Sequence, residues 1–199
     1  MIIRDVESLS NAGSAFLAYF YFDFKDTRKQ DSRALLSSLL DQLSNQSDQC
    51  RDVLRELYIE HHDGSKKPHE DALFRCLKDM ITIAEPAPVY LVLDALDECP
   101  NDPGFPTSRE KVLSLVKKLA ELAHTDLHIC ITSRPEFDIR TTLEPLATQQ
   151  LSLHDESGQQ KDITDYVTSV VLSDSNMQRW RDDEKNMVIE ELTTKADGM

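Results

Sequence analysis

The chain has 199 residues, which is long enough for one domain, or for one domain and part of another. Hydrophobic residues make up 40% of it, which supports a buried core, but no apolar run approaches the roughly 20 residues that a membrane span requires. The formal net charge of −14 disfavours sequence-independent binding to nucleic acid, which needs clustered lysine and arginine. We therefore expect a globular protein with neither nucleic acid nor a membrane as a partner.

The cysteines indicate the compartment. Cys50, Cys76, Cys99 and Cys130 lie far apart and form no C-x-x-C pair. The N-terminus also lacks the charged-then-apolar order of a signal peptide. We expect reduced thiols in an intracellular protein, in the cytoplasm.

The first half of the chain predicts a helix, a strand and a group of helices. Residues 1–11 have apolar side chains at helical spacing, and residues 15–24 (AFLAYFYFDF) are rich in aromatic residues, as strands are. Asp31 or Ser32 should cap a leucine-striped helix. Further helices are expected over 47–61 and 69–84, with a polar loop at 62–68 between them.

The second half alternates strands and helices before it becomes helical throughout. A strand over 89–93 is followed by a proline-rich loop at 100–106, and a capping box at 107–110 opens a helix that runs to about 123. A strand over 127–132, a short helix over 137–143 and a weak strand over 149–153 follow. This order predicts a parallel α/β sheet with flanking helices. We place a boundary near residue 155, so that 156–199 starts a helical domain that is cut off.

The most informative segment is residues 89–98 (VYLVLDALDE), an apolar strand that ends in Asp94, Asp97 and Glu98. Open α/β sheets bind their ligands at the carboxyl ends of the strands. Crowded carboxylates repel one another unless a cation lies among them. The Mg²⁺ ion of a Mg²⁺–nucleotide complex is a suitable candidate for that cation. We expect Asp94 to hold Mg²⁺, and Asp97 and Glu98 to polarise an attacking water. The alternative is an ordinary acidic loop after a buried strand.

A second strand, in residues 129–135 (ICITSRP), ends in a hydroxyl pair and Arg134. The planar guanidinium of Arg134, with Ser133 beside it, could contact the γ-phosphate of a nucleotide. Pro135 restricts the backbone at the point where Arg134 emerges. The alternative is a surface arginine that forms a salt bridge with Asp94 or Glu98.

Together, LVLDALDEC and ICITSRPE resemble the NACHT domains of STAND-type P-loop NTPases, especially fungal NLR-like proteins and the nephrocystin-like N-terminal domain group. FLAYFYFDF and the leucine-rich helix after it are also similar to that group. The resemblance implies a P-loop NTPase-like sheet in which Asp94 is the Walker B aspartate and Arg134 the sensor 1 arginine. It likewise makes Asp97 and Glu98 the extended acidic pair. Ala95 departs from the glycine that many NACHT sequences have there.

The phosphate-binding motif G-x-x-x-x-G-K-[ST] is missing, because no two of the five glycines have its spacing. In the family this loop precedes the helix that residues 1–11 resemble, so we expect a truncation just after it. ATP or ADP with Mg²⁺ would then be a cofactor of the intact parent and not of this chain. Without the P-loop strand, the strand at 127–132 is left with an unpaired edge, or 149–153 fills the gap. We therefore expect a marginally stable or aggregation-prone chain.

The leading hypothesis is a partial NACHT-type signalling switch, in which slow ATP hydrolysis by the intact parent controls oligomerisation. Its partners would be further copies or other signalling domains. One alternative is a non-enzymatic remnant that binds proteins and no nucleotide, and another is a different P-loop ATPase. An in-frame Walker A motif in the coding DNA upstream of Met1 would favour the switch.

Overall fold

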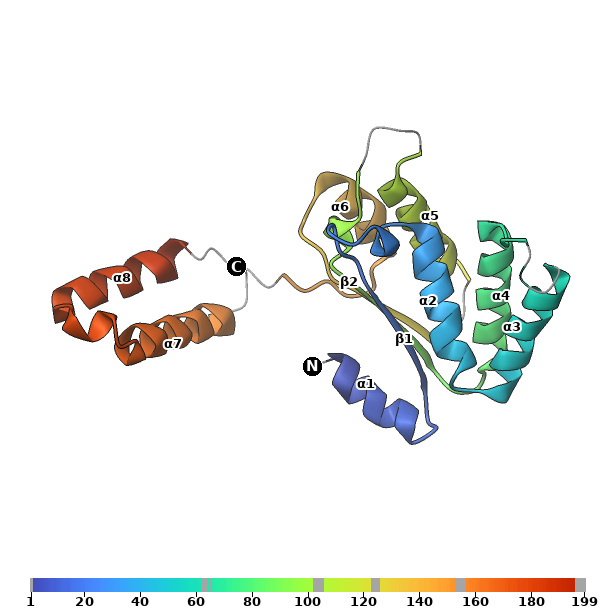
Figure 1. Ribbon diagram of the computed structural model, residues 1–199, viewed down its shortest axis with the longest axis horizontal. Coiled ribbons are helices and arrows are strands. Elements are labelled where there is room, and N and C mark those ends of the chain that lie inside the picture. The colour runs from blue at the N-terminus through green and yellow to red at the C-terminus, as the bar shows by residue number, and fades with distance from the viewer. Residues whose placement is uncertain are drawn as a thin grey trace. The chain divides into compact units, whose positions relative to one another are not determined.

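The computed structural model describes residues 2–61, 64, 66–101, 106–122, 126–152 and 157–195. The chain forms two compact units, Met1–Ala147 and Thr148–Met199 (Figure 1). The first unit contains the sheet and all the candidate site residues, and the second consists of helices. The boundary expected near residue 155 lies outside the described residues.

The sheet of the first unit is parallel, as the sequence predicts, but it has three strands in the described part of the chain where four were expected. Its strands are β1 (Phe16–Tyr21), β2 (Val89–Asp94) and β3 (Leu127–Ile131), in the order β1-β2-β3. The register pairs Tyr21 with Asp94 and Leu93 with Ile131. All three strands therefore end at the same border of the sheet, and the acidic segment that follows β2 lies between the ends of its two neighbours.

The helices of the first unit lie close to the predicted ranges, and the second unit is helical, as expected. The first unit contains α1 (Ile2–Asn11), α2 (Ser32–Ser44), α3 (Asp48–Glu60), α4 (Glu70–Ile83), α5 (Ser108–Ala120) and α6 (Phe137–Leu143). It also has short 3₁₀ turns at Thr27–Lys29, Leu96–Glu98 and Glu144–Leu146. The second unit contains α7 (Ser157–Ser173) and α8 (Asp182–Lys195), with a 3₁₀ turn at Met177–Arg179 between them. No helix in the described part of the chain is long and apolar enough to span a bilayer.

The helix starts follow local side-chain chemistry. The Asp31 carboxylate accepts a hydrogen bond from the backbone N–H of Ala34, and so caps α2. Thr107 and Glu110 form the predicted capping box at the start of α5, each side chain accepting from the backbone N–H of the other. Each such cap contributes about 1 kcal/mol by pairing amides that a helix end leaves free.

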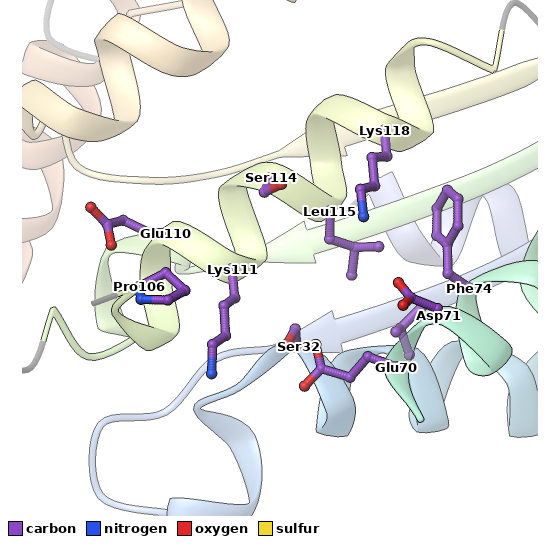
Figure 2. Close-up of a pocket in the computed structure, with 11 residues that line it drawn as sticks. Ser32, Glu70, Asp71, Phe74, Pro106, Glu110, Lys111, Ser114, Leu115 and Lys118 are labelled. Carbon is purple, nitrogen blue, oxygen red and sulfur yellow. Dashed lines mark hydrogen bonds between the residues drawn. The ribbon is translucent and has the colours of Figure 1, made fainter. Parts of the chain in front are cut away.

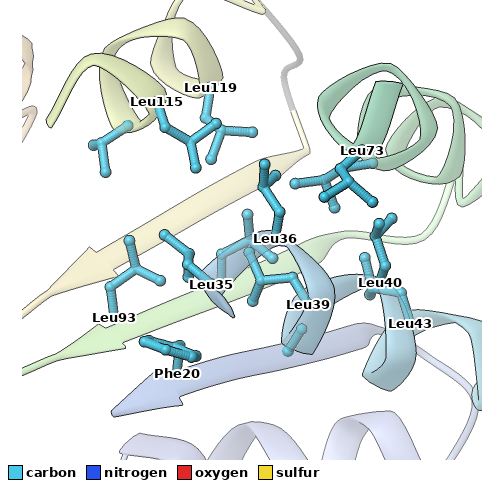
Figure 3. Packing of buried hydrophobic residues seen from close by; sticks show 14 of the residues in the cluster. Phe20, Leu35, Leu36, Leu39, Leu40, Leu43, Leu73, Leu93, Leu115 and Leu119 are labelled. Atoms are coloured by element: carbon cyan, nitrogen blue, oxygen red, sulfur yellow. The ribbon is translucent and has the colours of Figure 1, made fainter. Parts of the chain in front are cut away.

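The core lies between one face of the sheet and the helices packed on it, above all α2. Figure 3 shows the leucines of α2 between the sheet and the neighbouring helices. Five of them are at most 2% exposed: Leu35, Leu36, Leu39, Leu40 and Leu43. Truncating any one to alanine should cost about 2–5 kcal/mol, because the cavity left behind adds to the lost burial.

The outer edge of β1 is closed by two glutamine side chains, Gln42 of α2 and Gln46 of the turn that follows it. The amide of Gln42 donates to the carbonyl of Tyr19 at 2.7 Å and accepts from its N–H at 3.0 Å. Gln46 makes the same pair of bonds with Leu17, at 2.6 and 2.9 Å. The two side chains thus stand in for a neighbouring strand, and they satisfy backbone groups that the edge of a sheet exposes.

The weak strand predicted over 149–153 is wrong for its described part, since residues 149–152 form no strand and Leu153 lies outside the described residues. The segment offers Gln149 and Gln150 in place of β-branched residues, and its Leu151 side chain is 81% exposed. Within the described ranges, β3 pairs only with β2. The structure therefore shows the first of the two expected arrangements, in which β3 is an edge strand.

Candidate functional site

Asp94 is held at the end of β2 by a hydroxyl from the neighbouring strand end. The Thr132 hydroxyl donates to Oδ1 of Asp94 and accepts from the backbone N–H of Ala95 at 3.0 Å. A second link follows, in which the N–H of Leu96 donates to the carbonyl of Thr132 at 3.0 Å. The ends of β2 and β3 are therefore joined directly, and the orientation of the Asp94 carboxylate is set by Thr132.

The backbone turns sharply after Asp94. Ala95 has φ 56° and ψ 48°, a left-handed conformation that an L residue other than glycine adopts at a cost. The 3₁₀ turn Leu96–Glu98 follows and buries the Leu96 side chain completely. This turn directs Asp97 and Glu98 toward different neighbours.

Asp97 binds Arg134 through both of its carboxylate oxygens. Oδ1 accepts from the backbone N–H of Arg134 at 3.0 Å, and Oδ2 lies 3.4 Å from its Nε. The Asp97 side chain is 12% exposed and that of Arg134 is 84% exposed. Glu98 instead accepts a hydrogen bond from the backbone N–H of Phe24 at 3.3 Å. The structure thus pairs Arg134 with Asp97, rather than with the Asp94 or Glu98 of the alternative interpretation.

Arg109, at the start of α5, ties these segments together and was not predicted as a site residue. Its side chain is 6% exposed, with Nε donating to the carbonyl of Cys99 at 2.9 Å and Nη2 to that of Asp97 at 2.6 Å. Its Nη1 forms an ion pair with Glu136 and lies 3.5 Å from Oδ2 of Asp138. One buried guanidinium therefore fixes the acidic turn against the segment that opens α6.

A signal for Arg109 is present in the sequence. Its position falls in register with Val112 and Val116, both buried on the inner face of α5. An arginine at an inward helical position predicts buried acceptors. The capping box at the same helix end already accounts for the polar residues of this first turn, so the sequence pattern alone did not single out Arg109.

An open cleft of about 510 Å³ lies beside the acidic turn. Its lining residues are Phe24, Gln30, Asp97, Glu98, Cys99, Pro100, Arg109, Arg134 and Glu136. Asp94 and Ser133 are not among them. The Ser133 hydroxyl instead donates to the carbonyl of Arg134 at 2.7 Å. The site residues thus share one border of the sheet, but only Asp97, Glu98 and Arg134 of the predicted set face this cleft.

The negative charge of Asp94 acts on its neighbours across the strands. The pKa of the Cys130 thiol is raised by burial and by the Asp94 carboxylate. The pKa of Tyr21 is raised by the same causes, with smaller contributions from Tyr19 and Glu7. Both groups therefore stay protonated at neutral pH, and neither supplies an anionic ligand beside Asp94.

The residues present fit a magnesium ion only through a single carboxylate. Among the described residues, no group of three or more histidine, cysteine, aspartate and glutamate side chains could hold a metal ion. Mg²⁺ in nucleotide sites uses one or two carboxylates and completes its shell with water and phosphate oxygens. Asp94 meets this requirement through Oδ2, since Thr132 bonds to its Oδ1. Both oxygens of Asp97 lie on Arg134, and one oxygen of Glu98 accepts from the backbone of Phe24.

A second hollow, of about 210 Å³, lies between the first turns of α2 and α4 and the side of α5 (Figure 2). The buried hydroxyl of Ser32 donates to Glu70 at 2.8 Å, and the Lys118 ammonium lies 5.8 Å from the centre of the Phe74 ring. None of the predicted site residues lines this hollow. Ser32 and Glu70 bond to each other across this hollow and Glu110 caps the start of α5, so we assign it no ligand.

The geometry accords with the comparison to known families. The family described as Nephrocystin 3, N-terminal matches residues 1–134, which include all three strands and the acidic turn. The chain belongs to this family. No curated protein and no solved structure matches the chain.

Proposed function

We propose that this chain is part of a NACHT-type nucleotide switch, in which the bound nucleotide controls oligomerisation of the intact parent. The observation that carries the proposal is that β2 and β3 end side by side, with Asp94, Asp97 and Arg134 at one border of the sheet. Ligands of open α/β sheets bind at this border. The family membership supports the same assignment.

Asp94 would hold the Mg²⁺ of the nucleotide complex, since Thr132 fixes one of its oxygens and therefore its orientation. The ion would supply charge neutralisation for the phosphates when it is bound. Arg134 is the residue proposed to contact the terminal phosphate. Its guanidinium is largely exposed, so a phosphate could displace Asp97 from it at little cost, because exposed ion pairs contribute about 0–1 kcal/mol.

The chain lacks a cradle for the phosphates. Gly13 and Gly64 have positive φ, but neither is followed by a second glycine at the spacing that a P-loop needs. We therefore propose that residues 1–199 do not bind ATP at micromolar concentration. Nucleotide binding would require hydrogen-bond donors to the phosphates from outside this sequence.

Isothermal titration calorimetry tests both the proposed metal role of Asp94 and the proposed lack of ATP binding by residues 1–199. The 199-residue chain should show no heat of ATP–Mg²⁺ binding at micromolar concentration. A chain extended by an upstream in-frame Walker A motif should bind, and Asp94→Ala should abolish its binding while Asp174→Ala, in the second unit, leaves it intact. A micromolar dissociation constant for residues 1–199 that Asp94→Ala removes would overturn the proposed incompetence. An extended chain that bound equally well with Asp94→Ala would overturn the metal role.

A second candidate is a non-enzymatic interaction module, which binds protein partners and no nucleotide. The specific observation in its favour is that Asp97 and Glu98 are both occupied by protein groups, Arg134 and the backbone of Phe24. These contacts would be structural in such a protein. The extended chain distinguishes the two candidates, because an interaction module would not bind ATP even with the motif restored.

A further inference from the structure

The backbone of Arg134 is fixed at two atoms, its amide nitrogen and its carbonyl oxygen. The N–H donates to Oδ1 of Asp97 at 3.0 Å. The carbonyl accepts from the hydroxyl of Ser133 at 2.7 Å and from the N–H of Glu136 at 2.8 Å. Pro135, between these residues, has a φ angle restricted by its ring. The point at which the Arg134 side chain leaves the backbone is therefore determined by its neighbours in sequence and by Asp97.

The two oxygens of Asp97 make contacts of unequal quality. The distance of 3.0 Å from Oδ1 to the backbone nitrogen of Arg134 lies in the usual range for an N–H···O hydrogen bond, whereas Oδ2 lies 3.4 Å from Nε. The Asp97 side chain is largely buried, but that of Arg134 is largely exposed. Water therefore screens the contact with the guanidinium far more than the contact with the amide. The main contact of Asp97 is with the backbone of Arg134.

Arg109 completes a ring of contacts around this hydrogen bond. Its Nη2 donates to the carbonyl of Asp97 at 2.6 Å, and its Nη1 forms an ion pair with Glu136. The ring runs from the Asp97 carboxylate through the backbone of Arg134 to Glu136, and returns through Arg109 to the main chain of Asp97. The acidic turn and the segment after β3 are thus joined at two points, one of which is the Asp97 carboxylate.

This arrangement does not suit a carboxylate that polarises water. A general base needs an oxygen within hydrogen-bond reach of the proton that it accepts. Both oxygens of Asp97 lie on Arg134 instead. The guanidinium of Arg134 can turn toward a phosphate while the hydrogen bond to Oδ1 stays in place, because that bond is made by the backbone.

We propose that Asp97 is a positioning residue, which fixes the backbone from which Arg134 reaches the terminal phosphate of a nucleotide. Asp97 then acts on the nucleotide only through Arg134, and it does not polarise the attacking water. This inference rests on the proposed function, because it takes Arg134 as the residue that contacts the phosphate.

Two substitutions of Asp97 separate the positioning role from an acid–base role. Asp97→Asn keeps an oxygen that can accept from the N–H of Arg134, but its neutral amide cannot take a proton from water. Asp97→Ala removes the acceptor as well as the charge. A positioning role predicts that asparagine substitutes for aspartate and alanine does not, whereas an acid–base role predicts that both variants fail.

Amide hydrogen exchange of the 199-residue chain, followed by NMR, tests the contact without a nucleotide. The amide of Arg134 should stay protected in Asp97→Asn and exchange at least about tenfold faster in Asp97→Ala. Asp26→Ala is the matched control, since it removes a hydrogen bond of the same kind, from the N–H of Arg28, and should leave the Arg134 amide unchanged. Asp97→Leu, of nearly the same shape as aspartate, replaces Asp97→Ala if circular dichroism shows that the alanine variant does not fold.

The chain extended by an upstream Walker A motif tests the role toward the nucleotide. In Asp97→Asn, the preference for ATP over ADP and the rate of ATP hydrolysis should each stay within about fivefold of those of the unsubstituted extended chain, because only an exposed ion pair is lost. In Asp97→Ala both should fall at least about tenfold, since Arg134 is misplaced. Arg134→Lys should lower both in the same way.

Three results would overturn the proposal. They are an Arg134 amide that stays protected in Asp97→Ala, hydrolysis that asparagine and alanine at position 97 abolish equally, and a preference for ATP that neither variant changes while hydrolysis is lost. An extended chain that binds no ATP would instead overturn the proposed function. The hydrogen exchange of residues 1–199 would still decide whether Asp97 holds the backbone of Arg134.

Discussion

Ala95 has a left-handed backbone conformation, which its β-carbon disfavours. Among the described residues other than glycine, it alone has a positive φ. The conformation is imposed by the hydrogen bonds that flank it, from its own N–H to Thr132 and from Leu96 to the carbonyl of Thr132. A glycine at this position would adopt the same geometry without strain.

Ala95→Gly should therefore stabilise the protein. Relief of the left-handed strain is worth about 1–2 kcal/mol, and the greater flexibility of glycine in the unfolded chain offsets about 0.4–1 kcal/mol of it. We expect a net gain of about 0.5–1 kcal/mol in the free energy of unfolding, measured by urea denaturation. Ala147→Gly is the control, because Ala147 has an ordinary φ of −73°, and it should be neutral or destabilising. A loss of stability in Ala95→Gly would contradict this account.

At the scale of elements, Arg109 connects the acidic turn, α5 and the start of α6. Its donors satisfy the carbonyls of Asp97 and Cys99, and its charge is balanced by Glu136. Buried groups of this kind are costly to leave without partners. The contribution of Arg109 should therefore be large, even though it lies outside the hydrophobic core.

Arg109→Met should lower the free energy of unfolding by about 3–5 kcal/mol, because it leaves buried acceptors unpaired. Arg109→Lys should recover only part of this loss, since an ammonium cannot reproduce the fork of a guanidinium. Arg28→Met removes the surface ion pair with Asp26 and should change the free energy of unfolding far less than Arg109→Met does. Chemical denaturation of the three variants checks the order. A cost for Arg109→Met as small as that for Arg28→Met would refute the structural role.

Elements with strong local signals could be predicted from the sequence. The leucine stripe of α2 and the capping box of α5 determine both helices through side chains only three or four residues apart. The weak strand at 149–153 had no such support, and its described part forms none. The glutamines that close β1 could not be predicted, since Gln42 in α2 and Gln46 just after it are ordinary polar residues until the fold places them beside the strand.

The candidate site was predictable to the extent that it follows strand topology. Parallel strands end at one border, so Asp94 and Arg134 had to lie at the same side of the sheet. The pairing of Arg134 with Asp97, and not with Asp94, depends on the left-handed turn at Ala95. The order in which side chains pair within a loop is decided by such local geometry, which periodicity does not reveal.

For the molecule as a whole, the open edge of β3 predicts limited stability. An edge with half-buried apolar residues contributes less burial than the central strand it resembles in sequence. We expect the purified chain to melt at or below about 60 °C, or to aggregate on heating, as followed by circular dichroism and light scattering. A sharp, cooperative transition above that temperature would contradict the expectation.

Removing the side-chain cover of β1 should change the size of the assembly. The double variant Gln42→Ala/Gln46→Ala exposes the backbone of Leu17 and Tyr19, and so gives the sheet a second open edge. Exposed backbone groups at the edge of a sheet can pair with those of another chain. Light scattering of the double variant should show species larger than those of the unsubstituted 199-residue chain. The control Gln178→Ala, in the second unit, should show no such increase. A mass distribution equal to that of the unsubstituted chain would argue against the role of Gln42 and Gln46 in covering the edge of β1.

The guanidinium of Arg109 also has a mechanical consequence. Its side chain binds the loop after β2 and the residues that open α6 at the same time, so these segments are joined through one residue. A displacement of α6 would strain the hydrogen bonds from Arg109 to the carbonyls of Asp97 and Cys99. Arg109 would thus link a movement of α6 to the position of Asp97.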